Sequence, residues 1–440
     1  MGTRRLRGRG CGGYFRSYIN FYFAEKEKNS IFADILKYQF LEKMESLIIT
    51  SDRLVQHTNA GFIRYLYSNI AWNNRLTGII GAKGTGKSTL LLQHIKLNFP
   101  DRSKALYASL DNIWFTKHSL SELAEDFYNL GGTHLFLDEV HKYQSWAMEI
   151  KNIYDSYPTL HIVFTGSSML EIFNASVDFS RRIVLYELKG LSFREFLKYE
   201  DAIELPVFDL SSILKDHRTI ASEITSKIKI LPEFKKYLEY GYYPYYKENI
   251  ATYPIQVEQS IHKTLNEDLP AIENIEYATI LKIKKLLGII AEMVPFTPNI
   301  TNLSAAIEIG RHSMTKYLYL LDKAGIIQCI TEPKPTLQTL AKPQKVYLEN
   351  TNIIHSLAFQ NINTGNVRET FFANQLRTKH KVNTAENGDF TIDGNTVFEV
   401  GGKNKSASQI KNIENAYIAA DDIETGFANK IPLWLFGFLY

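Results

Sequence analysis

The stretch from Leu76 to Asn98, LTGIIGAKGTGKSTLLLQHIKLN, decides the fold of this chain. Its first residues form an apolar run typical of a buried strand, and Lys87 to Leu97 carry the apolar spacing of a helix. The segment between them fills the Walker A pattern GxxxxGK(S/T) with Gly81, Gly86, Lys87 and Ser88. A chance glycine-rich turn is disfavoured because both flanking elements are present, so the stretch predicts a phosphate-binding loop (P-loop).

The chemistry of such a loop follows from its backbone. Successive N–H groups point inward at the start of a helix, where the helix dipole also favours a phosphate, and glycines permit the close approach. We expect Lys87 to reach the β- and γ-phosphates of ATP and the Ser88 hydroxyl to bind Mg²⁺. The residues expected to hold the nucleotide are Gly81, Ala82, Lys83, Gly84, Thr85, Gly86, Lys87, Ser88 and Thr89.

The composition is that of an ordinary globular protein: 440 residues, of which 45% are hydrophobic and 22% are charged. The formal net charge of +3 neither demands nor excludes a nucleic-acid partner. Only Cys11 and Cys329 are present, which excludes a disulfide framework and favours a reducing cytosol. No apolar run approaches the ~20 residues needed to cross a bilayer, so we expect a cytoplasmic protein without membrane contact.

The chain begins with MGTRRLRGRGCGGYFRSY, which has basic residues but no apolar segment behind them. A secretory signal is therefore not expected. Met44 suits a true start of the chain, and we interpret residues 1–43 as a flexible or misannotated extension.

A second motif carries acids at the end of a strand. After His134, the apolar residues Leu135 to Leu137 end in Asp138 and Glu139, as expected of a buried strand that delivers carboxylates at its C-terminal edge. This pattern looks like a Walker B element, in which Asp138 would hold Mg²⁺ and Glu139 would orient or deprotonate the attacking water. An acid pair at a helix N-terminus is the alternative interpretation.

Further polar groups follow the next strands. His161 to Phe164 predict a short strand, and Thr165 or Ser167 at its end would sense the γ-phosphate and the water, unless this is a simple turn. Arg181 and Arg182 precede another β-rich run and would neutralise transition-state charge in cis or across a boundary in a homo-oligomer. A solvated arginine pair is the alternative. Strands that alternate with helices predict an α/β fold with a parallel, doubly wound sheet.

Several stretches together resemble the prokaryotic AAA-type P-loop ATPases: GAKGTGKST, LFLDEVHKYQSW, VFTGSS, the SRR element and LSFREFL. The resemblance runs from about Met44 to the C-terminus and is strongest in the ATPase part. It implies an AAA-type ATPase domain over residues 44–200, a helical lid and winged helix over 201–335, and a mixed α/β restriction-endonuclease-like domain over 336–440.

Asn302 to Ile327, NLSAAIEIGRHSMTKYLYLLDKAGII, fits two helices with a turn at Gly310, followed by a strand. This is a winged helix-turn-helix pattern that puts cationic side chains on the recognition helix: Arg311, His312 and Lys316. Binding of double-stranded DNA and a purely structural lid remain alternative interpretations.

The last module contains DFTIDGNTVFEVGGKNK. Its Asp389, Glu399 and Lys403 resemble the acid, acid, lysine set of restriction-endonuclease-like nucleases, with Glu369 on a preceding helix as a further ligand. In that family, carboxylates hold Mg²⁺ beside a scissile phosphate and the lysine positions or activates water.

This module departs from the family pattern at Gly401, which stands where the family has its lysine. Either a bulge at the glycine pair returns Lys403 to the site, or the domain is an inactive relative. Asp393 competes with Asp389 for the place of the first acid.

The sequence therefore supports one leading hypothesis, an ATPase that couples turnover to a macromolecular partner, either DNA or a protein. A second hypothesis is a STAND-like signalling switch, in which nucleotide is rarely hydrolysed and assembly is the output. A third is an ATP-regulated DNA nuclease, which ranks lower because the lysine is displaced. A DNA-binding regulator without turnover ranks below these, since Glu139 suits hydrolysis.

Overall fold

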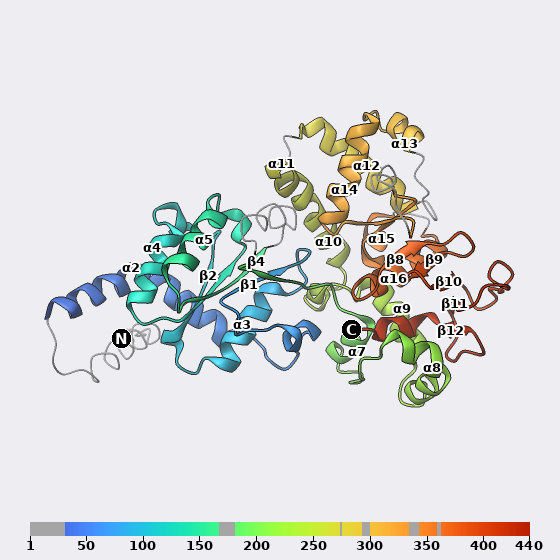
Figure 1. Cartoon of the computed structure of the whole chain (residues 1–440), viewed down its shortest axis with the longest axis horizontal. Coiled ribbons are helices and arrows are strands. Elements are labelled where there is room, and N and C mark those ends of the chain that lie inside the picture. The colour runs from blue at the N-terminus through green and yellow to red at the C-terminus, as the bar shows by residue number, and fades with distance from the viewer. Residues whose placement is uncertain (1–30, 167–180, 273–274, 293–299, 334–342, 359–361) are drawn as a thin grey trace, which may run out of the picture. The chain divides into compact units, whose positions relative to one another are not determined.

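The computed structural model describes residues 31–166, 181–272, 275–292, 300–333, 343–358 and 362–440 (Figure 1). The chain divides into two compact units. The first comprises residues 1–60, 73–77 and 91–164, and the second comprises residues 61–72, 78–90 and 165–440. Among the described residues, no helix is long and apolar enough to cross a membrane.

A five-stranded sheet carries the predicted nucleotide motifs, with the strand order β2-β3-β4-β1-β5. Its strands are β1 (Leu76–Ile80), β2 (Ala105–Ser109), β3 (His134–Asp138), β4 (His161–Gly166) and β5 (Val184–Glu187). β3 pairs in parallel with both β2 and β4. β1 is buried along its whole length, and β2, β3 and β4 along most of theirs, as expected of strands covered on both faces. The predicted α/β fold is confirmed.

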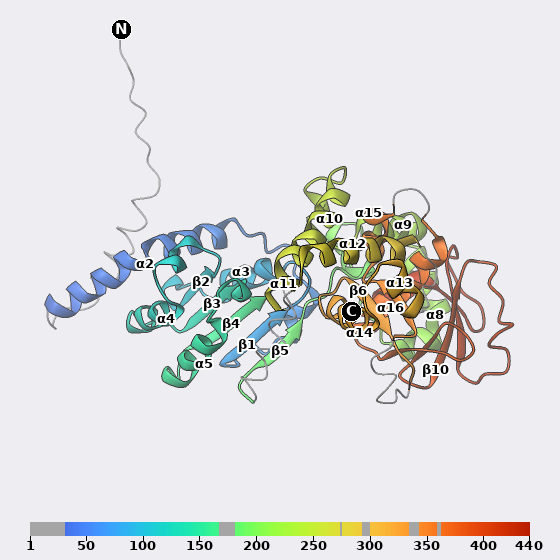
Figure 2. The same cartoon turned by 90° about the horizontal axis from the view of Figure 1, so that it is seen from above.

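The connecting helices are α3 (Lys87–Asn98), α4 (Leu120–Asn129) and α5 (Trp146–Ser156). α4 begins at a capping box in which the Ser119 hydroxyl accepts from the Glu122 N–H and the Glu122 carboxylate accepts from the Ser119 N–H. α4 packs against α5, beside the strands of the sheet (Figure 2). Short 3₁₀ helices lie at Tyr65–Asn69, Arg102–Lys104, Ile113–Thr116 and Val140–Lys142.

Helix α2 (Ile31–His57) packs against β2 and α4. Lys43 on this helix pairs with Asp126 at 2.9 Å, and its carbonyl accepts a hydrogen bond from Trp114 Nε1 at 2.9 Å. The expected boundary at residue 43 therefore falls inside a helix whose residues on both sides of that position, Leu41 and Met44, are buried.

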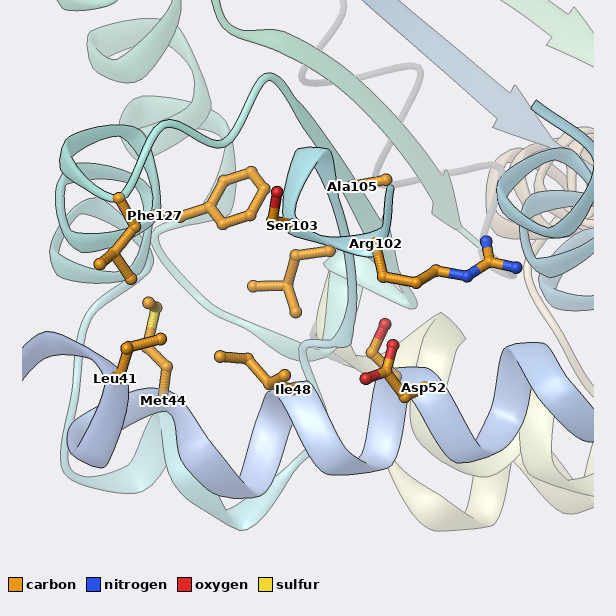
Figure 3. Close-up of a pocket in the computed structure, with 11 residues that line it drawn as sticks. Leu41, Met44, Ile48, Asp52, Arg102, Ser103, Ala105 and Phe127 are labelled. Atoms are coloured by element: carbon orange, nitrogen blue, oxygen red, sulfur yellow. The ribbon is translucent and has the colours of Figure 1, made fainter. Parts of the chain in front are cut away.

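A small cavity of about 30 Å³ lies between α2 and the sheet (Figure 3). Leu41, Met44 and Ile48 point toward it from α2, and Phe127 faces them from α4. Polar side chains also line the cavity, which is about the size of a water molecule: Ser51, Asp52, Arg102 and Ser103.

The second unit begins its C-terminal part with helices. They are α7 (Phe193–Tyr199), α8 (Leu210–Thr225), α9 (Ile230–Tyr240), α10 (Tyr253–Lys263), α11 (Leu269–Ile272) and α12 (Tyr277–Glu292), with a 3₁₀ helix at Pro244–Lys247 and a π-helix at Thr264–Asp268. A helix pair and a hairpin follow: α13 (Ile300–Ala306), α14 (Arg311–Lys323), β6 (Ile327–Ile330) and β7 (Lys345–Leu348). α14 packs on α13 and β6, and β6 pairs with β7 in antiparallel fashion.

A mixed sheet closes this unit, with the strand order β12-β11-β10-β9-β8. The remaining elements are α15 (Thr351–Leu357), α16 (Thr364–Arg377), β8 (Val382–Thr384), β9 (Phe390–Ile392), β10 (Thr396–Gly401), β11 (Ala416–Ala420), β12 (Lys430–Pro432) and a 3₁₀ helix at Leu433–Phe438. β10 pairs in parallel with β11 and in antiparallel fashion with β9. α16 packs on β10, so the expected mixed α/β module is present.

Candidate functional site

The P-loop follows β1 directly, and its glycines have the conformations that the motif requires. Gly84 and Gly86 have φ of 83° and 96°, which side-chain-bearing residues rarely adopt. A Cβ on Gly84 would overlap the ring of Tyr245, and the methyl group of Ala82 lies 3.7 Å from the position of a Cβ on Gly325. The loop backbone is therefore packed closely against residues of the C-terminal part of the second unit.

Lys87 is buried at the centre of this loop. Its ammonium group donates to the carbonyls of Gly81 and Ala82, at 2.9 Å each, and the residue is only 5% exposed. The Thr85 hydroxyl also donates to the Ala82 carbonyl, at 2.9 Å. These bonds keep the cation inside the loop, where a phosphate would meet it. Ser88 is half-buried at the start of α3.

Arg64, which the sequence did not point to, contacts the same loop. Its Nη1 donates to the Thr85 carbonyl, and its Nε and Nη2 donate to the two carboxylate oxygens of Glu195 at 3.1 Å each. The side chain of Arg64 is 5% exposed, and that of Glu195 is 2% exposed. The buried ion pair joins Arg64, the residue before the 3₁₀ helix Tyr65–Asn69, to Glu195 on α7, and its arginine also binds the P-loop backbone.

Asp138 is the last residue of β3 and is 3% exposed. The Tyr107 hydroxyl on β2 donates to Asp138 Oδ2 at 2.6 Å, and burial together with this carboxylate raises the pKa of Tyr107 well above its usual value. Tyr107 therefore stays protonated and fixes the carboxylate as a hydrogen-bond acceptor. Tyr107 lies on β2, which pairs in parallel with the acidic strand β3. A sequence search of the neighbouring strand could therefore have found this tyrosine.

Glu139 turns the chain sharply after the strand. Its φ of 53° lies in the left-handed region, which is uncommon for a residue with a side chain and is frequent at functional sites. Its carboxylate lies 3.4 Å from Nε2 of the buried His141 in the following 3₁₀ helix. The turn and the contact with His141 orient the Glu139 side chain.

For the other residues expected in the ATPase site, the structure gives burial and backbone conformation but no contact that tests their roles. Thr165 is fully buried in β4, while Ser167 lies outside the described residues. Arg181 is exposed with a φ of 71°, and Arg182 is half-buried just before β5. Their roles as sensor and as arginine fingers stay predictions.

In the C-terminal module, Glu369 and Asp389 share a lysine that the sequence did not single out. Lys345 Nζ on β7 lies 3.6 Å from Glu369 Oε2 and 3.4 Å from Asp389 Oδ1. The Tyr347 hydroxyl donates to Glu369 Oε2 at 2.6 Å, and burial together with Asp389 raises the pKa of Glu369. Asp393 instead bonds His380 at 2.7 Å, so of the competing acids Asp389 is the one in this cluster.

Glu399 on β10 pairs with Lys405 rather than with Lys403. Lys405 Nζ lies 2.6 Å from the Glu399 carboxylate, which is 1% exposed, whereas Lys403 is exposed. Gly401 explains the exchange, because a Cβ there would lie 2.7 Å from Lys405 Cδ. The missing side chain lets Lys405 fold back over the strand.

Lys405 also links the acids electrostatically. Burial alone would lower its pKa, but Glu399, with the nearby Asp389 and Glu369, raises the pKa of Lys405 above its usual value. We call Glu369, Asp389, Glu399, Lys345 and Lys405 the carboxylate–lysine cluster. Within the part of the chain that the structure describes, no three acidic, histidine or cysteine side chains stand close enough to form a metal site by themselves.

Comparisons with known proteins bear on both units. Residues 73–197 match the family model described as an AAA domain, and residues 231–364 match that of a domain of unknown function, DUF8612. No curated protein matches the chain.

Among solved structures, the Walker-type ATPase PABY2304 of Pyrococcus abyssi has 13% identity over 76% of this chain and 99% of that chain, with a TM-score of 0.36. AMPPCP-bound DnaA from Aquifex aeolicus has 14% identity over 59% of this chain and 85% of that chain, with a TM-score of 0.26. Residues 73–197 are therefore similar to AAA domains, and both the Walker A and the Walker B patterns lie within this stretch.

Proposed function

We propose that this protein binds and hydrolyses ATP with Mg²⁺. The observation that carries the proposal is the P-loop, whose backbone has the required glycine conformations and whose Lys87 ammonium is held inside it. The donor set fits Mg²⁺, because the Ser88 hydroxyl and the Asp138 carboxylate supply the oxygen ligands that this ion prefers. Held by Ser88 and Asp138, the ion would supply positive charge that stabilises the negative charge developing on the phosphates.

The acids at the end of β3 supply the chemistry of hydrolysis. Carboxyl ends of parallel strands meet at one edge of a sheet, so we assign Asp138 to the ion and Glu139 to the attacking water. Glu139 would orient or deprotonate that water, with Thr165 or Ser167 as the sensor of the γ-phosphate. Arg181 and Arg182 would stabilise the transition state in cis or from a second copy.

ATP turnover with Mg²⁺ in the wild type and in Glu139→Gln tests this proposal. The variant should keep nucleotide affinity within about threefold but lose turnover by about 100-fold or more, as loss of a positioned base does. Glu125→Gln, at an exposed position of α4 outside the motif, is the matched control and should retain turnover. Undiminished turnover in Glu139→Gln would remove the base assignment, and a wild type that neither binds nor hydrolyses ATP would remove the function.

A STAND-like signalling switch is the alternative function, and measurements of assembly distinguish it from an ATPase that turns over ATP. It would show slow turnover together with a nucleotide-dependent change of size in gel filtration. A fast ATPase of constant size excludes it.

Double-stranded DNA is the partner that we assign to α14. Met314, Leu318 and Leu321 on this helix are buried, whereas Arg311 and His312 at its start are exposed, as is Lys316 one turn later. A helix with a polar, cationic outer face, followed by a hairpin, is the arrangement of a winged helix. ATP turnover with and without duplex DNA at several salt concentrations tests it, because phosphate contacts make the coupling salt-dependent. A flat response favours a protein partner.

The carboxylate–lysine cluster favours a second candidate function, Mg²⁺-dependent cleavage of DNA. The supporting observation is the Glu399–Lys405 pair, which restores an acid and a lysine beside each other despite Gly401. Lys345 also lines a surface cavity of about 750 Å³, through which a substrate would reach the cluster. Supercoiled DNA with Mg²⁺ and ATP tests the candidate: Lys405→Gln should abolish cutting and Lys403→Gln should not. Absence of cutting by the wild type refutes it.

A further inference from the structure

We propose that Arg64 is a positioning residue for the nucleotide, which aims a backbone N–H of the P-loop at the phosphates by holding the Thr85 carbonyl. The proposal rests on the ATP binding proposed above. It concerns residues of the second compact unit only.

Each nitrogen of the guanidinium group donates to a buried partner. Nη1 donates to Thr85 O, and Nη2 donates to the carbonyls of Lys189 and Gly190 at 2.7 and 2.8 Å. Nε and Nη2 also bind the Glu195 carboxylate. Glu195 is anchored in turn, because it accepts from the Tyr65 N–H at 2.6 Å and closes the capping box of α7 with Ser192. The direction of the Nη1 donor is therefore set by the fold.

The Thr85 carbonyl shares a planar trans peptide unit with the N–H of Gly86. In such a unit the carbonyl and the N–H point in opposite directions, so a carbonyl held toward Arg64 turns the Gly86 N–H away from it. Gly86 is the motif glycine beside Lys87, with a φ of 96°. Because glycine has no side chain to restrict φ, this peptide unit could adopt other orientations if nothing held it. Arg64 thus selects the orientation in which this N–H can serve a phosphate.

An arginine is required because one side chain must bind the Glu195 carboxylate and the Thr85 carbonyl at the same time. Its planar fork binds a carboxylate with one edge and presents a further N–H to a carbonyl, whereas the compact ammonium of lysine cannot span both. Arg64→Lys should therefore keep the charge opposite Glu195 but release the Thr85 carbonyl.

The test compares Arg64→Lys with Arg194→Lys. Arg194 lies next to Glu195 on α7 and donates to the Tyr440 carbonyl at 2.9 Å, not to the P-loop. We expect Arg64→Lys to raise the dissociation constant of Mg²⁺–ADP in calorimetry by about tenfold, the scale of one charge-assisted hydrogen bond. Arg194→Lys should stay within about twofold of the wild type.

A spectroscopic readout separates positioning from mere stability. In the wild type, addition of Mg²⁺–ADP should shift the Gly86 amide proton in a ¹⁵N-resolved NMR spectrum, as formation of a hydrogen bond to phosphate does. In Arg64→Lys that shift should shrink at saturating nucleotide, while the shifts of the following α3 amides persist. An unchanged Gly86 shift and an unchanged dissociation constant in Arg64→Lys overturn the proposal.

If Arg64→Lys fails to fold, the double variant Arg64→Met with Glu195→Leu replaces it, because it leaves no unpaired buried charge. It should show the same tenfold loss of affinity, and wild-type affinity in it also overturns the proposal. A wild type that binds no nucleotide refutes the proposed function instead, so the two failures are distinguishable.

Discussion

The P-loop and the carboxylate–lysine cluster differ in how the chain assembles them. The loop is one continuous segment whose shape depends on glycines and on the helix that it starts. The cluster draws its side chains from β7, α16, the residue before β9, β10 and the loop after β10. A local site such as the P-loop can be recognised from a sequence motif. A dispersed site such as the carboxylate–lysine cluster forms only when the sheet and helices pack together.

The largest effect is expected for the local site. Lys87→Ala should lower ATP turnover by about 100-fold or more, because it removes the cation held inside the loop. Lys96→Ala, on the same helix but bonded to the carbonyls of Gln56 and Thr58, is the matched control. A phosphate-release assay measures both, and near-normal turnover in Lys87→Ala would mean that the local pattern does not define the site.

The glycines allow a sharper test of the loop's packing. Gly84→Ala should destabilise the folded protein by about 3 kcal/mol, since both a positive φ and overlap with Tyr245 oppose the new methyl group. Gly86→Ala, which has a similar φ but open space at its Cβ, should cost about 1 kcal/mol. Urea unfolding gives both values. Equal costs would show that the contact with Tyr245 contributes nothing.

In the dispersed site, the two lysines of the GGKNK segment should behave differently. Lys405→Gln leaves the buried Glu399 carboxylate without its cation and should cost about 2 kcal/mol of unfolding free energy. Lys403→Gln should change it by less than about 0.5 kcal/mol, as surface substitutions do. Chemical denaturation of the two variants decides between them, and a larger loss in Lys403→Gln would return that residue to the cluster.

The smallest effect concerns Glu369 and pH. Burial, and then Asp389, raise its pKa above the usual 4.5, so the folded state holds this proton more tightly than the unfolded state. Stability should therefore fall as pH rises from 4.5 through the raised pKa and then level off. Glu369→Gln lacks this titration and should be more stable than the wild type at pH 7.

Urea unfolding between pH 4.5 and 8 measures this difference for Glu369→Gln. The exposed Glu386→Gln is the control and should follow the wild-type curve at every pH. If Glu369→Gln is less stable at pH 7, the pairing of Glu369 with Lys345 outweighs its burial.

The success of the sequence-based predictions also differs between the local site and the dispersed site. Leu76–Ile80, Lys87–Asn98 and the acids after Leu137 appear where their patterns indicated, because short-range spacing determines a buried strand or an amphipathic helix. The winged helix within residues 201–335 and the nuclease-like domain over residues 336–440 stay predictions.

Arg64, Tyr107, Lys345 and Lys405 were not found from the sequence. Arg64 lies 131 residues from Glu195, and only tertiary packing brings such a pair together. Lys405 was not predicted because it can reach Glu399 only when position 401 has no side chain. The family spacing expects a lysine at that position, so Gly401 counted against a site. Tyr107 alone had a usable signal, since it lies on the strand that pairs with the acidic one.

The contact of Gly84 with Tyr245 has a practical consequence for dissecting the protein. A fragment that ends near residue 200, where the resemblance would end the ATPase domain, keeps every motif residue but discards Tyr245 and Gly325. The P-loop of such a fragment would expose backbone that is covered in the whole chain, and its nucleotide affinity would not represent that of the protein. Fragments for nucleotide studies should retain the 3₁₀ helix Pro244–Lys247 and the end of α14.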